Sequence, residues 1–448
     1  MKLKKYFFAL LATLCLFSVA SCGESGPKAL KVFVGTESLS YYTSVLQEYA
    51  RENNLPFAIE VSGGDTGAYA DTFLRDTKKG ADIFVVAHDN FAKLLSGSGS
   101  IAPITKKSLI DNMKETVDPV FQDVCYLSAG GATPKYYGVP IIRQSLVLYY
   151  NKSLFAGKED KLNSWEGILE VATSKNKLAT AYSGTDGFSY SHWLLAQPSN
   201  QAAKTKFGTY GTLELFADGN ASACYAWGED QQLIHKYAQE FTANKNGRAG
   251  SVAGTSKWEV DLQQGLLCTV IGGAWHEKTI ASAWGPEGYG VTILPTFKVG
   301  ANKEYEFRSG SFYDVKCLVK KKGSEYASYL DDIMEYLSSD EIQQGSYEQC
   351  NNLPASNNVQ IKADDKLAKA QILQGQTAGM PQPFGYNEEF NPAYYVCGTG
   401  EAFVELHEGK AANDLVKTLK LICYTWSTGN TFDASLPDAT LNEWVNNR

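Results

Sequence analysis

The chain has 448 residues, of which 44% are hydrophobic and 20% are charged, and its formal net charge is −8. A chain of this length and composition can bury large hydrophobic cores and corresponds to roughly two or three domains. The acidic balance excludes nucleic acid as a partner and excludes electrostatic attachment to a membrane, because both need clusters of basic residues.

The first 27 residues have the pattern of a secretion signal. Three lysines precede an apolar run over residues 6–19, and the sequence VASC then ends at Cys22. The run is too short for a membrane-spanning helix of about 20 residues, and VASC resembles a bacterial lipobox. We therefore expect residues 1–21 to be a lipoprotein signal peptide and Cys22 to carry the lipid that anchors the chain to the extracytoplasmic face of the cell membrane. Plain cleavage near Ala20 with release of the chain is the alternative.

Neither the seven cysteines after Cys22 nor the five histidines have the spacing of a metal site. We expect the cysteines to be small buried core residues, with one or two disulfides as the alternative. The chain also lacks a phosphate-binding GxxxxGK(S/T) motif and a nucleophile-elbow GxSxG motif. We therefore expect no metal and no cofactor.

The first part of the chain alternates short apolar runs with helical patterns. We expect strands at 30–34, 57–61 and 82–86 and helices at 41–53 and 69–79. Continuous apolar strands between helices are typical of an α/β fold whose parallel sheet is covered on both faces. Ligands of such sheets bind beyond the carboxyl ends of the strands, so we expect one cleft to be lined by the loops 35–38, 63–65 and 87–90.

A second α/β run follows and predicts a second lobe. The expected strands are 146–150, 178–181, 266–271 and 289–294, and the expected helices are 164–173, 325–337 and 415–425. Ser164 has the residue type of a helix N-cap. Two α/β lobes without a long linker between them indicate chain crossovers and a cleft between the lobes.

Five segments carry a more specific signal when they are read together. They are GADIFVVAHDNFAKLLSGSGSIAPI, YYGVPIIRQSLVLYYNKSLF, NSWEGI, QQGLLCTVIGGAW and YGVTILPTFK. In this order they resemble the maltose/maltodextrin-binding protein family, and the resemblance extends from about Leu30 to the region of Met380. Members of this family are extracytoplasmic solute receptors of ATP-driven ABC importers.

The resemblance implies a two-lobed periplasmic-binding-protein fold with a hinge of crossover segments and an interlobe cleft. Such a hinge lets the lobes close over a ligand as rigid bodies. The implied first lobe comprises 28–142 with 298–358, the second comprises 147–294 with 359–448, and the hinge lies near 143–147, 295–298 and 354–360.

The resemblance also implies binding residues. Asp89 in the sequence AHD matches the family's hydroxyl-binding aspartate, and Trp275 after two glycines matches its stacking tryptophan. The alternatives are a helix N-cap for Asp89 and a core position for Trp275. Phe390 and Tyr190 fall in two aromatic ligand segments of uncertain register, where core packing is the alternative. Their rivals in these segments are Phe188, Trp193, Tyr386, Tyr394 and Tyr395.

The chain departs from the best-known member of the family at three positions. Val86 stands in place of a tryptophan, Asn90 in place of an arginine, and Gln144 in place of a hydroxyl-binding glutamate. Gln144 keeps the capacity to donate and accept hydrogen bonds. Glu37 and Asp65 are further candidates by position in their loops, and solvated loop side chains are the alternative.

We therefore expect a receptor, and not an enzyme, that captures maltose and maltodextrin-type oligosaccharides by hinge closure. The expected partners are the sugar, the permease subunits of an ABC transporter and the membrane, reached through the lipid anchor, and the chain is expected to be a monomer. One alternative is a receptor of the same fold for another sugar, such as another disaccharide or a glycosaminoglycan fragment. A secreted glycosidase that pairs Asp89 with Glu277 or Glu229 and an adhesin that inherited the fold are the others.

Overall fold

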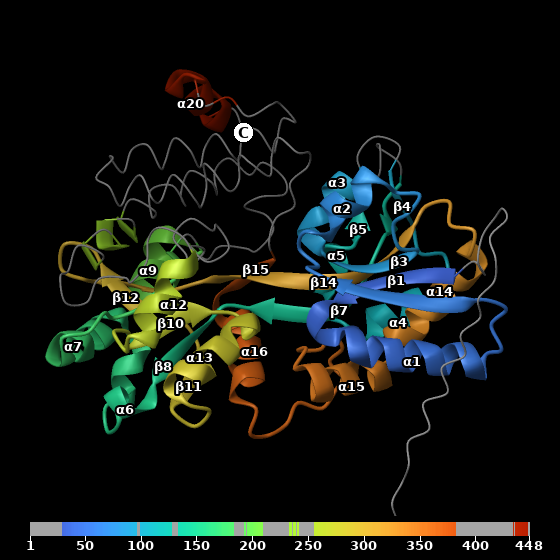
Figure 1. Cartoon of the computed structure of the whole chain (residues 1–448). Helices are drawn as coiled ribbons and strands as arrows, with labels where there is room; N and C mark the ends of the chain where they lie inside the picture. Colours follow the sequence, from blue (N-terminus) through green and yellow to red (C-terminus); the bar gives the residue numbers. More distant parts are fainter. Residues whose placement is uncertain are drawn as a thin grey trace, which may run out of the picture.

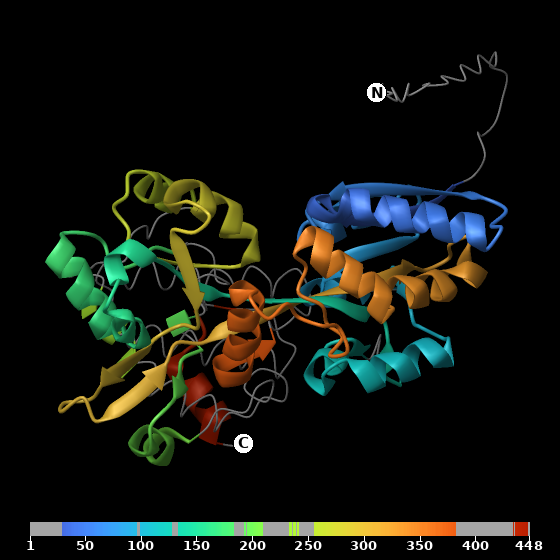
Figure 2. The same cartoon turned by 90° about the horizontal axis from the view of Figure 1, so that it is seen from below.

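The computed structural model describes residues 29–95, 99–127, 133–182, 192–193, 195–208, 233–234, 236–238, 240–241, 255–381, 433 and 435–446. These residues form two α/β lobes that lie side by side, joined by strands that cross between them (Figures 1 and 2). The predicted two-lobed fold is confirmed.

The first lobe is built on a mixed sheet with the order β15-β14-β3-β1-β2 (Figure 1). Its three N-terminal strands, β1 (Ala29–Gly35), β2 (Ala58–Gly64) and β3 (Ile83–Ala87), are parallel, as predicted. The long strand β14 (Ser311–Lys321) runs antiparallel to β3 and also pairs with β7 (Val139–Ser145), β4 (Ile101–Ala102) and β15 (Gly379–Pro381). The two-stranded β5 (Tyr126–Leu127) and β6 (Lys135–Tyr136) lie apart from this sheet.

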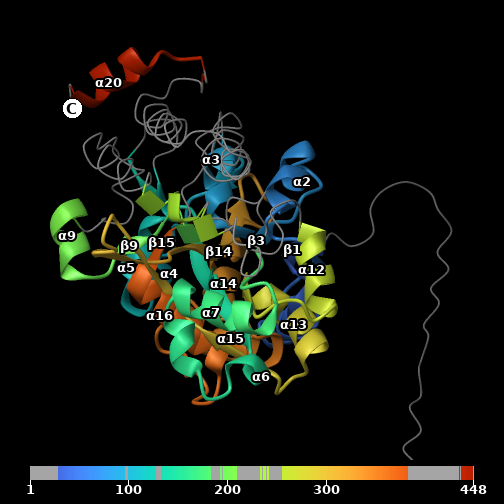
Figure 3. The same cartoon turned by 90° about the vertical axis from the view of Figure 1, so that its left-hand side faces the viewer.

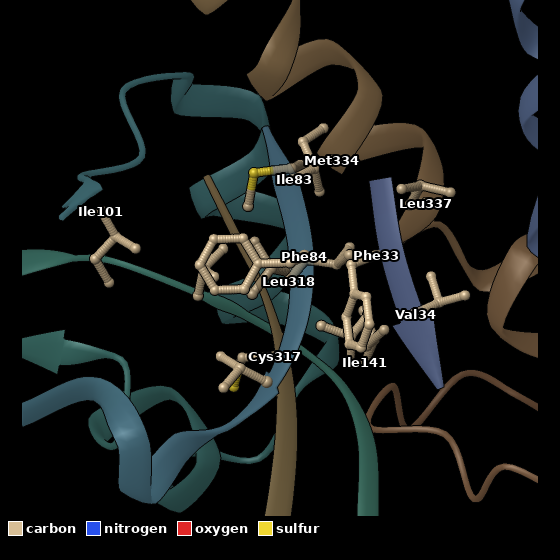
Figure 4. Close-up of a cluster of buried hydrophobic side chains, with 14 of the residues drawn as sticks. Phe33, Val34, Ile83, Phe84, Ile101, Ile141, Cys317, Leu318, Met334 and Leu337 are labelled. Atoms are coloured by element: carbon tan, nitrogen blue, oxygen red, sulfur yellow. The ribbon is translucent and has the colours of Figure 1, made fainter. Parts of the chain in front are cut away.

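Helices cover this sheet and bury a large apolar core. In α14 (Ala327–Leu337) the buried residues recur at the spacing of one helical face: Leu330, Ile333, Met334 and Leu337. Figure 4 shows Met334 and Leu337 beside Phe33, Ile83 and Phe84 of the neighbouring strands. The other helices of this lobe are α1 (Leu39–Glu52), α2 (Tyr69–Arg75), α3 (Phe91–Leu95), α4 (Lys107–Thr116), α5 (Pro119–Asp123) and α15 (Asp340–Cys350).

The second lobe is centred on β8 (Val147–Asn151), which pairs antiparallel with β10 (Thr269–Gly272) and β11 (Tyr289–Thr292). A second small sheet joins β12 (Thr296–Val299), β13 (Tyr305–Arg308) and β9 (Gln197–Pro198). Figure 3 views this lobe end on, with α9 at one flank and α12 and α13 at the other. Its helices are α6 (Lys152–Phe155), α7 (Trp165–Lys175), α9 (Gln201–Phe207), α12 (Thr255–Gln263), α13 (Glu277–Trp284) and α16 (Lys366–Ala378), and α20 (Asp438–Asn446) ends the described chain.

Most of the predicted elements that fall on described residues are present, with shifted ends, but the strand predicted at 178–181 does not form. Ser164 caps α7, because its side chain accepts a hydrogen bond from the backbone N–H of Gly167. The predicted strand at 178–181 is only a ladder of backbone hydrogen bonds beside β10 with a single bridge between Leu178 and Leu267. The helix predicted over 69–79 ends at Arg75, because Asp76 leaves helical dihedral angles. The helix predicted at 415–425 lies outside the described residues.

The chain passes between the lobes at two strands and one loop. At the end of β7, Ile142 packs in the first core, whereas Leu146, directly after the strand, packs in the second. On β14, Phe312 packs in the second core and Val315 in the first. The crossing on β14 comes later in the chain than the hinge expected near 295–298, because the β12–β13 hairpin still packs with the second core. We therefore propose that the middle hinge segment is Phe312–Val315.

The third passage lies between Ala355, which packs in the first core, and Leu367 on α16, which packs against β8 and its neighbours. This helix, orange at the centre of Figure 2, lies at the junction of the two lobes. The hinge expected near 354–360 falls within this passage and stays a prediction.

Three of the four described cysteines, Cys125, Cys268 and Cys317, are buried free thiols, and Cys350 is partly buried. The expectation of buried cysteines is confirmed for these three, whereas Cys224, Cys397 and Cys423 lie outside the described residues. Across the described part of the chain, none of the helices combines the length and the apolar character that a bilayer crossing requires.

Candidate ligand-binding cleft

A cavity of about 860 Å³ lies between the lobes. One side is formed by the loops after β1, β2 and β3, which supply Glu37, Asp65 and Asp89. These are the three loops that the sequence placed on one rim of the sheet. The opposite side is the turn before α13, which supplies Trp275, and β7 and β14 cross the floor with Gln144 and Asp314.

Asp89 lies directly after β3 in a short 3-10 turn, His88–Asn90. Its carboxylate accepts a hydrogen bond of 2.8 Å from Nδ2 of Asn90, which also donates to the carbonyl of Ala87 at 3.3 Å. Burial, and then the nearby Asp314 carboxylate, raise the pKa of Asp89 to about 7. Asn90 therefore orients the carboxylate, while the surroundings disfavour its charge.

Asp314 was not among the residues singled out in the sequence. It faces Gln144 across the β14–β7 ladder, and both residues line the cavity. The available signal was one acidic residue inside an otherwise mostly apolar strand, in the sequence SFYDVKCLV. That signal alone does not say which face of the strand the carboxylate occupies.

Glu37 and Asp65 lie at the rim of the cavity and are exposed. One carboxylate oxygen of Asp65 accepts a hydrogen bond of 2.8 Å from the backbone N–H of Gly67, which closes a tight turn. A hydrogen bond also holds the loop that carries Glu37, because Asn352 donates to the buried hydroxyl of the neighbouring Ser38 at 2.8 Å. Both residues are therefore held in ordered loops that line the cavity.

Trp275 presents a large exposed ring to the cavity. Its exposed fraction is 48%, which excludes the alternative of a core tryptophan. The ring lies against Gly273, where an added Cβ would come within 2.2 Å of it, so only glycine permits this approach. Tyr149 holds the turn by donating its hydroxyl hydrogen bond to the carbonyl of Gly273 at 3.0 Å.

Two neighbours support the Trp275 turn from below. His276 packs against Trp258 with ring centroids 4.9 Å apart, and burial lowers the pKa of His276 to about 4. The imidazole is therefore neutral at physiological pH. Glu277 begins α13 and accepts a hydrogen bond of 2.7 Å from the Tyr289 hydroxyl.

Three further described residues that the sequence analysis named, Val86, Asn90 and Trp193, do not line the cavity. Val86 and Trp193 are fully buried in the two cores, and Asn90 is 3% exposed and acts on Asp89. The predicted ligand residues Phe390 and Tyr190 lie outside the described residues, as do Phe188, Tyr386, Tyr394, Tyr395, Glu229 and the lipid attachment residue Cys22.

A second cavity of about 460 Å³ adjoins the first and shares Glu277 and Asn351 with it. Its polar groups are largely paired with one another, for example Tyr347 with Asp365 at 2.6 Å. In the described ranges, groups of three or more His, Cys, Asp or Glu side chains arranged to hold a metal ion are absent.

The first cavity combines hydrogen-bond acceptors on one side with an aromatic face on the other, which suits a hydroxyl-bearing ring.

A family model described as bacterial extracellular solute-binding protein matches residues 44–375. The maltooligosaccharide ABC transporter solute-binding lipoprotein of Streptococcus pneumoniae is 24% identical over 427 residues, covering 90% of both chains. The maltodextrin-binding protein MdxE of Bacillus subtilis is 24% identical over 84% of this chain and 87% of its own length. A galactooligosaccharide-binding protein of B. subtilis is 22% identical over 59% of each chain.

Solved structures share the fold. A maltodextrin-binding protein of L. casei without ligand superposes with a TM-score of 0.68 at 16% identity, over 90% of this chain and all of the other. A maltose-binding periplasmic protein of Listeria monocytogenes in complex with maltose has a TM-score of 0.65 at 18% identity, over 91% and 100% of the two chains.

Proposed function

The chain belongs to the bacterial extracellular solute-binding protein family, and we propose that it captures maltose and maltodextrin-type oligosaccharides in the cleft between its lobes. Proteins of this family are non-catalytic receptors, so the chain is the solute-binding component of a carbohydrate ABC transporter and not a glycosidase. The sugar specificity is our proposal.

One observation carries the proposal: the exposed ring of Trp275 faces a floor and rim of carboxylate and amide acceptors. The C–H faces of a glucose ring are apolar and stack on an aromatic face, whereas its hydroxyls donate to acceptors in the plane of the ring. Asp89, Gln144 and Trp275 meet both needs from two lobes. The names of the relatives in S. pneumoniae and B. subtilis point to the same class of sugar.

A thermal-shift screen followed by calorimetric titration tests the proposal. Maltose, maltotriose and maltotetraose are compared with galactooligosaccharides, because one relative binds the latter by name. A ligand present at about 100 times its dissociation constant stabilises the folded state by about 2.7 kcal/mol, which gives a clear shift of the melting temperature. A shift with maltodextrins that exceeds the shift with galactooligosaccharides supports the proposal. Selective binding of a galactooligosaccharide, or a shift with neither class, contradicts it.

We further propose that the receptor is held at the cell membrane through a lipid on Cys22 and passes its sugar to the permease subunits of an importer. The sequence VASC after an apolar run motivates this proposal. Two acyl chains on one diacylglycerol anchor a protein firmly, whereas one chain anchors it marginally. Cys22→Ser removes the thiol that forms the thioether, so the chain should move from the detergent phase to the aqueous phase. Unchanged partition into detergent would contradict the anchor.

A further inference from the structure

Three neighbouring segments bring a row of oxygen acceptors to the floor of the cavity. Strand β14 lies between β3 and β7, with Lys316 opposite Ala87 on one side and Asp314 opposite Gln144 on the other. The backbone N–H of Val315 donates to Nδ1 of His88 at 3.2 Å, which fixes the turn after β3 against β14. Asp89, Asp314 and Gln144 therefore lie side by side, and all three line the cavity.

Two of these acceptors are unsatisfied. Oδ1 of Asp314 and Oε1 of Gln144 are buried, and neither accepts a hydrogen bond from a described residue. The Gln144 side chain is only 8% exposed. A buried acceptor without a donor costs folding free energy, so a ligand that brings donors to this floor recovers free energy on binding. The floor thus favours a ligand rich in hydroxyl groups.

The charges around the floor restrict the ligand further. Five carboxylates line the described part of the cavity, against the ammonium groups of Lys278 and Lys316; the carboxylates are those of Glu37, Asp65, Asp89, Glu277 and Asp314. A sugar that carries a carboxylate or a sulfate would meet like charge on the floor and on the rim. The cavity therefore disfavours uronic-acid and sulfated oligosaccharides.

We propose that Asp314 is a ligand-binding residue, which joins Asp89 and Gln144 in one acceptor row for the hydroxyls of a single sugar unit and makes the receptor selective for uncharged sugars. This inference rests on the proposed function of the cleft. It adds a residue from β14, and it excludes glycosaminoglycan fragments from the class of ligands.

Proton binding to the acceptor row should make the affinity for the ligand depend on pH. Burial and the neighbouring Asp314 raise the pKa of Asp89 to about 7, while Lys93 on α3 and the Asn90 amide act in the opposite direction. The other groups around the row are the buried imidazole of His88 and the cavity-lining side chains of Lys316, Glu37, Asp65, Glu277 and Lys278. Hydroxyl donors bind the ionised carboxylate, so ligand and proton compete, and affinity falls as the pH drops below about 7.

Calorimetric titration with maltotriose between about pH 5.5 and about pH 8.5 tests the inference on the wild type, Asp314→Asn, Asp314→Ala and the control Asp123→Asn. Asp123 is exposed and lies away from the cavity. We expect wild-type affinity to fall below about pH 7, by at most about tenfold for each pH unit. Asp314→Asn and Asp314→Ala should weaken binding by about tenfold or more at about pH 8. In Asp314→Asn the midpoint of the pH dependence should also move to lower pH, because Asp89 loses a neighbouring charge.

The outcomes separate the inference from the proposed function. If the wild type binds maltotriose and both Asp314 variants match it in affinity and pH profile, Asp314 is not a ligand residue, although the maltodextrin receptor stands. If the wild type binds another neutral sugar instead, the proposed maltodextrin specificity fails, and the same variants are titrated with that sugar. Binding of a glucuronate-containing disaccharide at least as tight as binding of neutral sugars, or no binding of any sugar, overturns the inference.

Discussion

The two sides of the cleft are built on different principles. The floor and the rim of the first lobe carry carboxylates and an amide, which lie in the loops after β1, β2 and β3 and on the paired strands β7 and β14 of the same sheet. The second lobe contributes an exposed aromatic ring on a turn that is backed by glycine and fixed by Tyr149. The polar side can form hydrogen bonds only with hydroxyl groups at particular positions. The aromatic side supplies a flat apolar surface that tolerates a shift of the sugar along the cleft.

This difference indicates where specificity and where free energy of binding arise. Hydrogen bonds to charged acceptors are directional and depend on a fixed sheet register, so we expect the polar side to select among sugars. Stacking depends on area more than on direction, so we expect the aromatic side to add affinity for many sugars. Changes on the two sides should therefore have different effects.

The largest effect is expected at Asp89, where stability and binding oppose each other. The folded chain holds the Asp89 proton more tightly than the unfolded chain, because the pKa of this group rises from 3.8 to about 7. This contribution favours the folded state at acidic pH and is lost as the pH rises from about 4 through about 7. Asp89→Asn removes the buried charge, so at about pH 8 it should raise the free energy of unfolding of the ligand-free protein by at most about 4 kcal/mol.

Urea unfolding of the ligand-free wild type and of Asp89→Asn across this pH range checks the prediction, with Asp123→Asn as the control. The difference in the free energy of unfolding between the wild type and Asp89→Asn should vanish below about pH 4. Equal stability at about pH 8 would show that the carboxylate is well solvated.

A change at the same position should have the opposite effect on binding. Asp89→Ala is expected to lose a charge-assisted hydrogen bond of about 1.5 to 3 kcal/mol and to bind maltotriose about tenfold to a hundredfold more weakly.

On the aromatic side, Trp275→Ala should weaken binding of maltose and maltotriose by about tenfold to a hundredfold. The loss combines about 0.5 to 1.5 kcal/mol from the ring geometry with the apolar area that the sugar no longer covers. The matched control is Tyr126→Ala, because Tyr126 is 46% exposed on β5 and does not line the cavity. Titration with a panel of sugars distinguishes the two sides of the cleft. Trp275→Ala should weaken the binding of all the sugars by similar factors, and a change of the preferred sugar would contradict the expectation that the polar side sets the selectivity.

Much of the polar side could be predicted from the sequence. The strands β1 and β3 are mostly apolar, whereas β2 alternates partly buried and exposed residues. Parallel strands place their carboxyl ends on one edge, which located Glu37, Asp65 and Asp89 together. Asp314 could not be located in this way. Its place on the floor depends on the antiparallel register of β14 with β7, and a register of pairing is a property of two distant segments.

The middle hinge segment shows the same limit. The β12–β13 hairpin has short strands that either lobe could have accommodated, and only its pairing with β9 and the packing of its own Phe297 and Phe307 in the second core assign it to the second lobe. Trp275 was located by resemblance, whereas composition could not distinguish its exposed ring from Trp165 and Trp193, which are buried. Abundant aromatic residues serve both purposes in this chain.

A smaller effect is expected from Gly273→Ala, which tests the support of the ring without removing it. The backbone of Gly273 has φ −94° and ψ −177°, which alanine also adopts, so the turn itself is not strained. The new Cβ would collide with the Trp275 ring and displace it. We expect binding weakened by about threefold to tenfold, less than for Trp275→Ala, on the order of 1 kcal/mol. In the Trp275→Ala background the same change should add nothing, and an additive loss in this double-mutant cycle would contradict the contact.

The smallest signal is a change of overall dimensions on binding. A sugar that contacts Trp275 and the acceptor row is covered from both sides only when the lobes approach, so it binds the closed arrangement more tightly and shifts the population toward it. Small-angle X-ray scattering should therefore show a smaller radius of gyration with saturating maltotriose than without it. Trp275→Ala saturated with maltotriose serves as the comparison, because it lacks the ring through which the second lobe holds the sugar, and its radius should decrease less. A wild-type radius that stays constant at saturation would mean that the lobes are already closed or do not move, and that the crossings at β7 and β14 do not act as a hinge.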